Sequence, residues 1–335
     1  MYPDSIQAQH YQVYFNDEGF DFLNRFVAEQ RPSKIFLLAD KYTNECCTPI
    51  VLSLLATDIP LEIIEIEAGE THKHIDTCTQ VWYALSELGA DRKSLLINIG
   101  GGVVTDLGGF VASTYMRGIP FINIPTSLLA MVDASVGGKT GVDLGALKNL
   151  VGVINNPKGV VIYPDFLATL PTEELRSGMA EMFKHGLISD EAYWHKMCNL
   201  SELTEAHLGS LIYESVVIKN EVVTQDPTEK GLRKTLNYGH TLGHAIESYC
   251  LQNPNRERLL HGEAIAIGMV LATYLSVKEL GFSMDKCDQV KAVMGEYFRK
   301  QEFTYEEITD ICQLMRFDKK NVSGNVHFVL LEAIG

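Results

Sequence analysis

A change of pattern near Val160–Pro164 is the sequence feature that most constrains the fold of this chain. Before it, strand-like apolar runs alternate with helical patterns, whereas after it one helical pattern follows another. Strands that alternate with helices are typical of a parallel sheet in an α/β domain. The 335 residues are also more than one small core usually organises. We therefore predict an α/β domain with a parallel-type sheet over residues 1–164 and a mostly α-helical domain over residues 165–335.

The individual elements follow from apolar periodicity and from stop signals such as Gly89. In the first part we expect helices at Cys46–Ala56 and Ile75–Leu88, and strands at Tyr11–Phe15, Lys34–Ala39, Leu61–Glu67, Ser94–Ile99, Phe121–Ile124 and Val160–Pro164. In the second part we expect a hairpin near Asn325–Leu330, after helices at Thr172–Leu187, Leu208–Thr224, Thr235–Cys250, Gly262–Leu280 and Asp285–Lys300.

The composition limits the classes of partner. A formal net charge of −15 argues against nucleic-acid binding, which normally requires a basic face. It leaves room for an anionic substrate, because a few clustered lysines and arginines can make a local positive pocket. Seven cysteines without a C-x-x-C pair favour a reducing compartment. The first residues lack a signal-peptide pattern, and the longest apolar tract, Ala264–Ser276, is too short to cross a bilayer. We expect a cytoplasmic protein without a membrane partner.

Three histidines suggest a metal site. His240 and His244 stand four residues apart, so both project from one face if their segment is helical. His261 begins a second apolar segment. Histidines from two helix starts can converge on one ion if a further ligand comes from elsewhere, and imidazole suits zinc, iron or cobalt. For this spacing alone, histidines that cap or pack helices are the alternative. Thr241 excludes the H-E-x-x-H pattern of zinc proteases.

A glycine turn, Gly100–Gly102, follows a predicted strand and precedes a helical pattern. Such a turn lets backbone N–H groups approach a pyrophosphate at a helix N-terminus. It is not the G-x-G-x-x-G fingerprint, because Thr105 stands in place of the third glycine. A plain tight turn is therefore the alternative. The stretch Gly137–Thr140 is similar to the end of a P-loop, but Asp133 in place of the first glycine excludes that motif.

Together these stretches resemble the 3-dehydroquinate synthase family, over nearly the whole chain and in the expected order. Glu181 and Lys184 alone would be an ordinary surface ion pair, worth about 0.3 kcal/mol, but they belong to this set. The matching segments are Gly69–Lys73, Gly100–Gly102 with Asp106, Arg117–Gly118, Pro125–Asp133, Gly137–Lys139, Lys148–Asn149, Thr169–Pro171, Gly178–Lys184, Arg233, Leu236–Glu247, His261–Glu263 and Asp318–Lys320.

The resemblance implies an N-terminal NAD-binding α/β domain and a mostly helical metal-binding domain, with a role for each matching residue. Three would be the ligands of one divalent metal ion, zinc or cobalt: Glu181, His240 and His261. The NAD contacts would be Asp40, Glu70, Lys73, Gly101, Gly102, Asp106, Thr126, Ser127, Lys139, Lys148 and Thr169. The substrate and catalytic residues would be Asp133, Lys139, Asn149, Lys184, Lys219, Arg233, Asn237, His244, and Lys319 or Lys320. Arg117 would reach the substrate of a neighbouring subunit, which implies a homodimer.

The implied reaction converts 3-deoxy-D-arabino-heptulosonate 7-phosphate to 3-dehydroquinate and phosphate, a step of the shikimate pathway of aromatic amino acid biosynthesis. It combines oxidation by NAD, phosphate elimination, re-reduction and an intramolecular aldol closure, so that NAD is not consumed. A substrate with a carboxylate and a phosphate requires several cations, which the lysines and arginines of the set would supply. No residue is assigned as the general base, because the substrate's own phosphate could accept the proton.

Two residues depart from the family pattern. Ser127 stands where a second threonine is common and keeps the hydroxyl. Asp143 replaces a frequent asparagine, and we expect it to face away from the phosphate pocket or to pair with a cation.

Three other functions are open. A sugar phosphate cyclase acting on sedoheptulose 7-phosphate would share the fold, NAD and the metal, but Lys139, Asn149, Arg233 and Asn237 favour the synthase. A metal-dependent polyol dehydrogenase would not need so many phosphate-binding cations. A non-catalytic protein with a structural metal is disfavoured because such sites are usually closed and rich in cysteine, and no cysteine adjoins the three proposed ligands.

Overall fold

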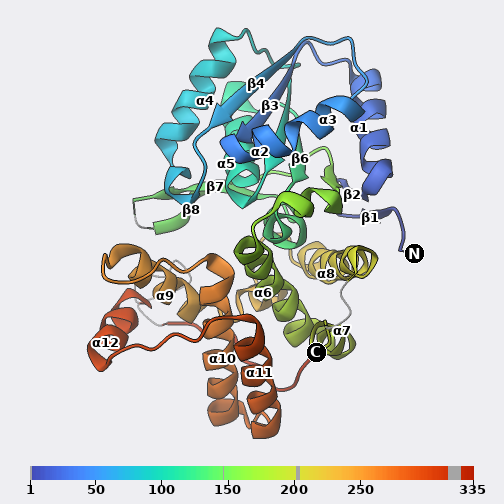
Figure 1. Cartoon of the computed structure of the whole chain (residues 1–335). Helices are drawn as coiled ribbons and strands as arrows, with labels where there is room; N and C mark the ends of the chain where they lie inside the picture. Colours follow the sequence, from blue (N-terminus) through green and yellow to red (C-terminus); the bar gives the residue numbers. More distant parts are fainter. Residues whose placement is uncertain (1, 146, 201–203, 316–325) are drawn as a thin grey trace. The chain divides into compact units, whose positions relative to one another are not determined.

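The chain divides into two compact units, Met1–Pro171 and Thr172–Gly335. The computed structural model describes residues 2–145, 147–200, 204–315 and 326–335. The first unit is a sheet with helices, and the second consists of helices (Figure 1). The boundary therefore falls after Pro171, past the short 3-10 helix Pro164–Thr169 in which the predicted boundary lies.

The first unit is built on a seven-stranded sheet in the order β1-β2-β9-β6-β5-β3-β4. Its pairs are parallel except for β1 with β2. The strands are β1 (Ser5–Gln7), β2 (Gln12–Phe15), β3 (Ile35–Asp40), β4 (Leu61–Ile66), β5 (Leu95–Gly100), β6 (Phe121–Pro125) and β9 (Val160–Ile162). The central strands β3, β5 and β6 are mostly apolar and almost entirely buried, as parallel strands covered on both faces require, and the buried Asn98 and Asn123 hydrogen-bond to each other. The predicted parallel-type sheet is confirmed.

The helices of the first unit are α1 (Asn16–Gln30), α2 (Lys41–Cys46), α3 (Thr48–Leu54), α4 (Ile75–Glu87) and α5 (Gly102–Thr114). The predicted helices Cys46–Ala56 and Ile75–Leu88 correspond to α3 and α4, and α5 begins where a helical pattern was expected after the glycine turn. No helix was predicted for the α1 segment. A separate antiparallel hairpin, β7 (Lys139–Leu144) with β8 (Leu147–Ile154), was also missed. Each strand contains one glycine, and a Cβ on Gly141 would lie 2.5 Å from the carbonyl oxygen of Val151. Glycine here permits the close approach of two backbones.

The second unit contains α6 (Thr172–Ser189), α7 (Glu191–Met197), α8 (Glu205–Gln225), α9 (His240–Gln252), α10 (His261–Leu280), α11 (Met284–Tyr297) and α12 (Tyr305–Leu314). The helical character predicted for this part is confirmed. The sequence analysis did not predict α7 or α12. The predicted hairpin near Asn325–Leu330 is wrong for its described residues, since 326–330 form no strand.

Close backbone contacts join the helices of the second unit. A Cβ on Gly268 of α10 would lie 2.0 Å from the carbonyl oxygen of Gly239, the residue before α9. A Cβ on Gly262 would lie equally close, at 2.0 Å, to the carbonyl oxygen of Ser177 in α6. Because only glycine fits at these points, α10 packs tightly against both α6 and the start of α9. These three helices carry the predicted metal ligands.

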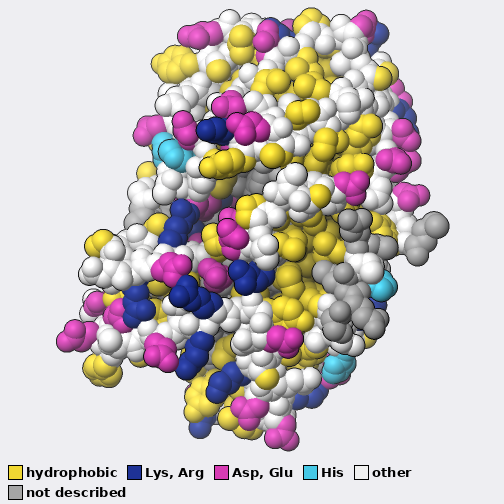
Figure 2. Space-filling model, viewed as in Figure 1, with side chains coloured by type: hydrophobic (Ala, Val, Ile, Leu, Met, Phe, Trp, Pro, Cys, Tyr) yellow, Lys and Arg dark blue, Asp and Glu magenta, His cyan; other side chains and the backbone are white. Residues whose placement is uncertain are grey.

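The surface of the protein is acidic, in line with its composition. On the face shown in Figure 2, acidic side chains are scattered over both units, and lysine and arginine side chains gather on the helical unit. In the part of the chain that the structure describes, no helix combines the length and apolar character that crossing a bilayer requires.

Candidate functional site

The predicted metal ligands meet within the helical unit. The Nε2 atoms of His240 and His261 lie 3.5 and 3.7 Å from the same carboxylate oxygen, Oε1 of Glu181. Ligand atoms bound at about 2.0–2.1 Å around one tetrahedral zinc ion are themselves about 3.4 Å apart. Each histidine nitrogen therefore lies from the Glu181 carboxylate at about the distance that separates two ligands of a single ion.

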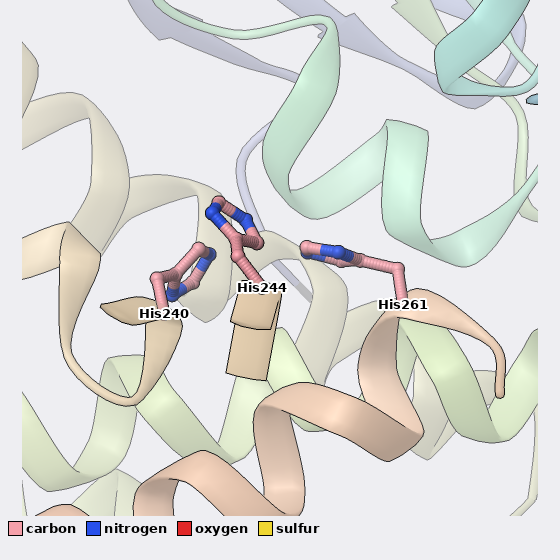
Figure 3. Close-up of side chains that lie close together, drawn as sticks. All are labelled: His240, His244 and His261. Carbon is pink, nitrogen blue, oxygen red and sulfur yellow. The ribbon is translucent and has the colours of Figure 1, made fainter. Parts of the chain in front are cut away.

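The sequence places these groups at helix starts and on a buried helix face. His240 and His261 are the first residues of α9 and α10, and Glu181 lies in the middle of α6 with no exposed surface. Figure 3 shows the rings of His240, His244 and His261 around one space. Potential ligand atoms of these histidines all lie within 4.8 Å of one another. The predicted convergence of the three histidines from two helix starts is thus present.

The other ring nitrogens of the two histidines have their own partners. Nδ1 of His240 lies 3.0 Å from the carbonyl oxygen of Tyr238, and Nδ1 of His261 lies 3.3 Å from Oε2 of Glu247. When Nδ1–H donates to such an acceptor, a neutral ring has its lone pair on Nε2. Nε2 is also the ring atom nearest Glu181 in both histidines. The donor set fits a divalent metal.

Electrostatics at the site also favour a cation. Burial lowers the pKa of His261, but the charges and hydrogen bonds of Glu247 and Glu181 outweigh this and raise it to about 9. In the metal-free protein a proton on this ring therefore supplies positive charge that a bound metal would otherwise provide.

Lys184 is the second cation next to Glu181. Its ammonium group forms a close ion pair with Oε2 of Glu181, and the two side chains are 1% and 0% exposed. The ordinary surface pair considered from the i,i+3 spacing is thus wrong: the pair is buried. His244 lies one helical turn after His240, with the ring centroids 5.1 Å apart.

Further predicted substrate residues lie on α8 and before α9. Lys219 and Arg233 are 5% and 2% exposed. Arg233 donates to the carbonyl oxygen of Pro227 at 2.8 Å, and Asn237 donates to Glu229 at 2.7 Å. These contacts hold the 3-10 turn Leu232–Asn237 that leads into α9. Lys319 and Lys320 lie outside the described residues.

The first unit has its own candidate site, at the carboxyl edge of the sheet. The chain passes from β3 to β4 on one side and then crosses to β5 on the other side of β3, so the connections diverge between β3 and β5. In open α/β sheets, ligands bind outside the carboxyl ends of strands at such a point. Asp40 ends β3, and Gly101 and Gly102 follow β5. Three of the predicted NAD contacts thus flank this point.

The start of α5 is open to an anion. Gly101 is its N-cap residue and offers no side chain to the first N–H groups. A Cβ on Gly101 would lie 3.2 Å from Oγ of Ser127, so the turn and the end of β6 are close. Thr126 continues this edge, since its N–H donates to the carbonyl oxygen of Gly100 at 3.0 Å. A helix N-terminus of this kind favours a phosphate group.

A polar network surrounds Lys73, which is only 4% exposed. Its ammonium group donates to Asp106 and to Asn149, each at 2.6 Å. The charge of Asp106 raises the pKa of Lys73 against the opposing effect of burial, and burial raises the pKa of Asp106 despite Lys73. Lys148 lies 3.4 Å from Glu70. Five predicted residues thus contact one another in two groups: Lys73 with Asp106 and Asn149, and Lys148 with Glu70.

Asp143 lies beside this network. Its Oδ1 accepts the backbone N–H of Asn149 at 2.6 Å, while burial raises the pKa of its carboxyl group. This contact also holds Asn149 in its left-handed backbone conformation, with φ of 50°. Asp143 thus has a backbone partner, and the expectation that it faces away from the phosphate pocket or pairs with a cation stays a prediction.

The remaining predicted residues of the first unit are on other elements. Thr169 donates to the carbonyl oxygen of Phe166 at 3.3 Å, and Asp133 lies in the π-helix Ala130–Ala134. Lys139 begins β7 with an exposed side chain, and Arg117 is exposed with φ of 69°.

Two residues of the helical site were missed as individual site residues: Glu247, which contacts His261, and Ser177, which accepts the N–H of Gly262 at 2.9 Å. Ser177 lies four residues before the predicted ligand Glu181 on α6, and Glu247 lies seven residues after the predicted ligand His240 on α9. The i,i+4 spacing places Ser177 on the same face of α6 as Glu181, but it does not indicate the contact with α10.

Comparison with solved structures defines the fold class. A 2-deoxy-scyllo-inosose synthase, solved with carbaglucose-6-phosphate, NAD+ and Co2+, is similar at a TM-score of 0.85 and 23% identity, covering 99% of this chain and 93% of that one. A 2-epi-5-epi-valiolone synthase from Streptomyces hygroscopicus, solved with NAD+ and Zn2+, matches at 0.80 and 25%, covering 100% and 93%. An iron-containing alcohol dehydrogenase matches at 0.67 and 14%, covering 95% and 93%. The fold is that of the sugar phosphate cyclases.

Sequence comparison then identifies the family. The profile for the 3-dehydroquinate synthase N-terminal part matches residues 63–177, and that for the C-terminal part matches residues 178–321. A 3-dehydroquinate synthase of Parabacteroides distasonis is 44% identical over 93% of this chain and 88% of its own length. One of Clostridium botulinum is 40% identical over 90% and 86%. The chain belongs to the 3-dehydroquinate synthase family, which confirms the predicted resemblance and favours this function over the alternatives.

Proposed function

We propose that this protein is a 3-dehydroquinate synthase, a phosphate-eliminating lyase that converts 3-deoxy-D-arabino-heptulosonate 7-phosphate to 3-dehydroquinate and phosphate. The observation that carries the proposal is the family match across both halves of the chain. The cluster of Glu181, His240 and His261 supports it from geometry, since their ligand atoms converge as a metal site requires. The reaction belongs to the shikimate pathway.

The proposed cofactors are NAD and one divalent metal ion, zinc or cobalt. The carboxyl edge of the sheet, with the open start of α5, would hold NAD, and Glu181, His240 and His261 would hold the metal. When bound, NAD accepts and returns a hydride, and the metal polarises the oxygen of the reacting alcohol. One carboxylate and two imidazoles leave coordination positions for substrate, as a catalytic site needs.

The protein's own groups would mainly bind and orient the substrate. Lys184, Lys219 and Arg233 are buried cations of the helical unit, and such groups can hold a carboxylate or a phosphate. In the N-terminal unit, Lys139 and Asn149 are the matching candidates. Orientation carries a large share of catalysis when the later steps proceed readily once the reacting groups are aligned. We assign no general base among the side chains.

The proposal also covers the assembly and the location of the protein. Exposed Arg117 would reach the substrate of a second subunit, so we propose a homodimer, which sedimentation of the purified protein would test. A cytoplasmic location stays the expectation from the sequence.

The function is tested by incubating the purified protein with 3-deoxy-D-arabino-heptulosonate 7-phosphate, a divalent metal and NAD at far less than the substrate concentration. Free phosphate and NADH absorbance are followed together. We expect phosphate in large excess over NAD without accumulation of NADH, because each hydride is returned. NADH formed in step with substrate oxidation, without phosphate, would indicate a dehydrogenase. If neither signal appears, sedoheptulose 7-phosphate is the next substrate to test.

A further inference from the structure

His261 is the first residue of α10, a position where a side chain needs support from other elements. Backbone N–H groups at a helix start have no partners within the helix, and helix ends fray unless such groups are satisfied. A metal ligand there has a defined place only if its ring and its backbone are both held. Two buried residues on other helices do this: Glu247 of α9 and Ser177 of α6.

Glu247 holds the ring. Its Oε2 lies 3.3 Å from Nδ1 of His261, and its side chain is 8% exposed. With the ring neutral, as a metal ligand must be, this carboxylate would hold the proton on Nδ1 and leave the Nε2 lone pair for a metal beside Glu181, whose Oε1 is 3.7 Å away. Glu247 lies seven residues, about two turns, after His240 on α9, so one helix supplies both a ligand and the support of another ligand.

Ser177 holds the backbone. Its hydroxyl oxygen accepts the N–H of Gly262, the second residue of α10, at 2.9 Å. The approach is possible because Gly262 has no Cβ, which would lie 2.0 Å from the carbonyl oxygen of Ser177. Ser177 and Glu181 are four residues apart on one face of α6. The contact therefore fixes the separation between the Glu181 carboxylate and the adjoining His261.

We infer that Ser177 and Glu247 are positioning residues that hold His261 in register with Glu181 and thereby set the affinity of the helical unit for its metal ion. The inference rests on the proposed metal site and adds to it two residues that would not touch the metal. A purely structural role would instead lower the stability of the fold and leave metal affinity unchanged.

The test measures metal affinity in the full-length protein, by competition for Zn2+ with a chromophoric chelator and by the visible absorption of the Co2+ form. Glu247→Leu removes the acceptor, and we expect the dissociation constant for Zn2+ to rise about 10- to 100-fold, as for other residues that support metal-bound histidines. Glu247→Gln keeps an oxygen acceptor without the charge, so its effect is smaller. We also expect the Co2+ absorption to change for Glu247→Leu. Affinities within twofold of wild type in both variants would overturn the role of Glu247.

Ser177→Ala removes one hydrogen bond and little volume. We expect about a 2- to 10-fold rise in the dissociation constant, the range that one hydrogen bond supplies. Gly295→Ala on α11 is the matched control, because a Cβ there meets nothing within 4 Å. Thermal unfolding of each metal-free variant identifies any general loss of stability. A Ser177→Ala protein that unfolds earlier yet binds Zn2+ as tightly as wild type would overturn the role of Ser177.

The wild-type protein separates this inference from the proposed function. If wild type binds Zn2+ tightly and the variants bind equally well, only the positioning roles fail. If wild type binds neither Zn2+ nor Co2+, the proposed metal site itself fails and the inference fails with it.

Discussion

At the scale of single residues, the fully buried pair of Glu181 and Lys184 differs most from what its spacing suggests. An i,i+3 pair on a helix usually lies in water and contributes little, because solvent screens both charges. Here neither side chain is exposed beyond 1%. A buried carboxylate depends on its partner charges, so Lys184 has a structural role in the metal-free protein in addition to the proposed role in substrate binding.

Lys184→Met tests this dual role. The substitution keeps an unbranched side chain of similar length but leaves the Glu181 charge without its ion pair. We expect the metal-free variant to lose about 3–5 kcal/mol of unfolding free energy, the usual cost of removing one partner of a buried pair. Saturating Zn2+ should recover part of the loss, because a bound cation replaces the missing charge. Urea unfolding with and without Zn2+ provides the measurement, and an unchanged midpoint in metal-free protein would exclude the structural role.

The sequence was informative about some of these residues and silent about others. The spacing of His240 and His244 and the helix start at His261 were enough to expect convergence on one ion. The assignment of Glu181 needed the family resemblance, since an acidic residue one turn from a lysine has no distinguishing pattern of its own. Glu247 and Ser177 act through contacts between helices, and these depend on tertiary packing that local periodicity does not encode.

At the scale of elements, the buried parallel strands were the easiest to predict. A strand covered on both faces reads as a continuous apolar run, as in β3, β5 and β6. The hairpin of β7 and β8 was missed because a glycine in each strand weakens the strand pattern, and the stretch Gly137–Thr140 at its start was compared with a P-loop, which was then excluded. The helices α7 and α12 have only 7 and 10 residues, so their apolar periodicity spans too few residues to stand out.

An ion pair between Arg256 and Glu307 anchors the first turn of α12. Arg256 donates to Oε1 of Glu307 at 2.6 Å and also contacts its Oε2, while Glu307 accepts the N–H of Thr304 at 2.7 Å within a capping box. The hydrogen bond from Arg256 is the largest effect on this carboxyl group and, with the Thr304 N–H, lowers the pKa of Glu307 to about 2.

This shift gives α12 an acid-dependent contribution to stability. A folded-state pKa below the unfolded value, about 4.3 for Glu, stabilises the fold above that value, and the contribution is lost as the pH falls toward 2. We therefore expect Glu307→Gln to lower the urea midpoint at pH 6, and the gap to wild type to close between about pH 4.3 and pH 2. Glu257→Gln is the control, because its pair with Arg299 is 72% and 67% exposed. A gap independent of pH would contradict the assignment.

At the scale of the whole molecule, the chain keeps its two candidate cofactor sites on different units. The glycine turn at Gly101 and Gly102 belongs to the unit Met1–Pro171, whereas Glu181 and His261 belong to Thr172–Gly335. A ligand that binds only the folded protein raises stability by mass action, by about 2.7 kcal/mol at a concentration 100 times its dissociation constant. Each cofactor should therefore stabilise the protein through its own set of residues.

His261→Ala separates the two contributions. In wild type we expect both NAD and Zn2+ to raise the melting temperature. In the variant the Zn2+ shift should disappear, because one of three ligands is missing, while the NAD shift should persist, because no residue at the carboxyl edge of the sheet has changed. Phosphate release from the sugar-acid substrate should fall to background. Thermal scans at matched ligand concentrations measure this, with Gly295→Ala as the control that should keep both shifts. Loss of both shifts in His261→Ala would instead mean that the two sites depend on one another for their structure.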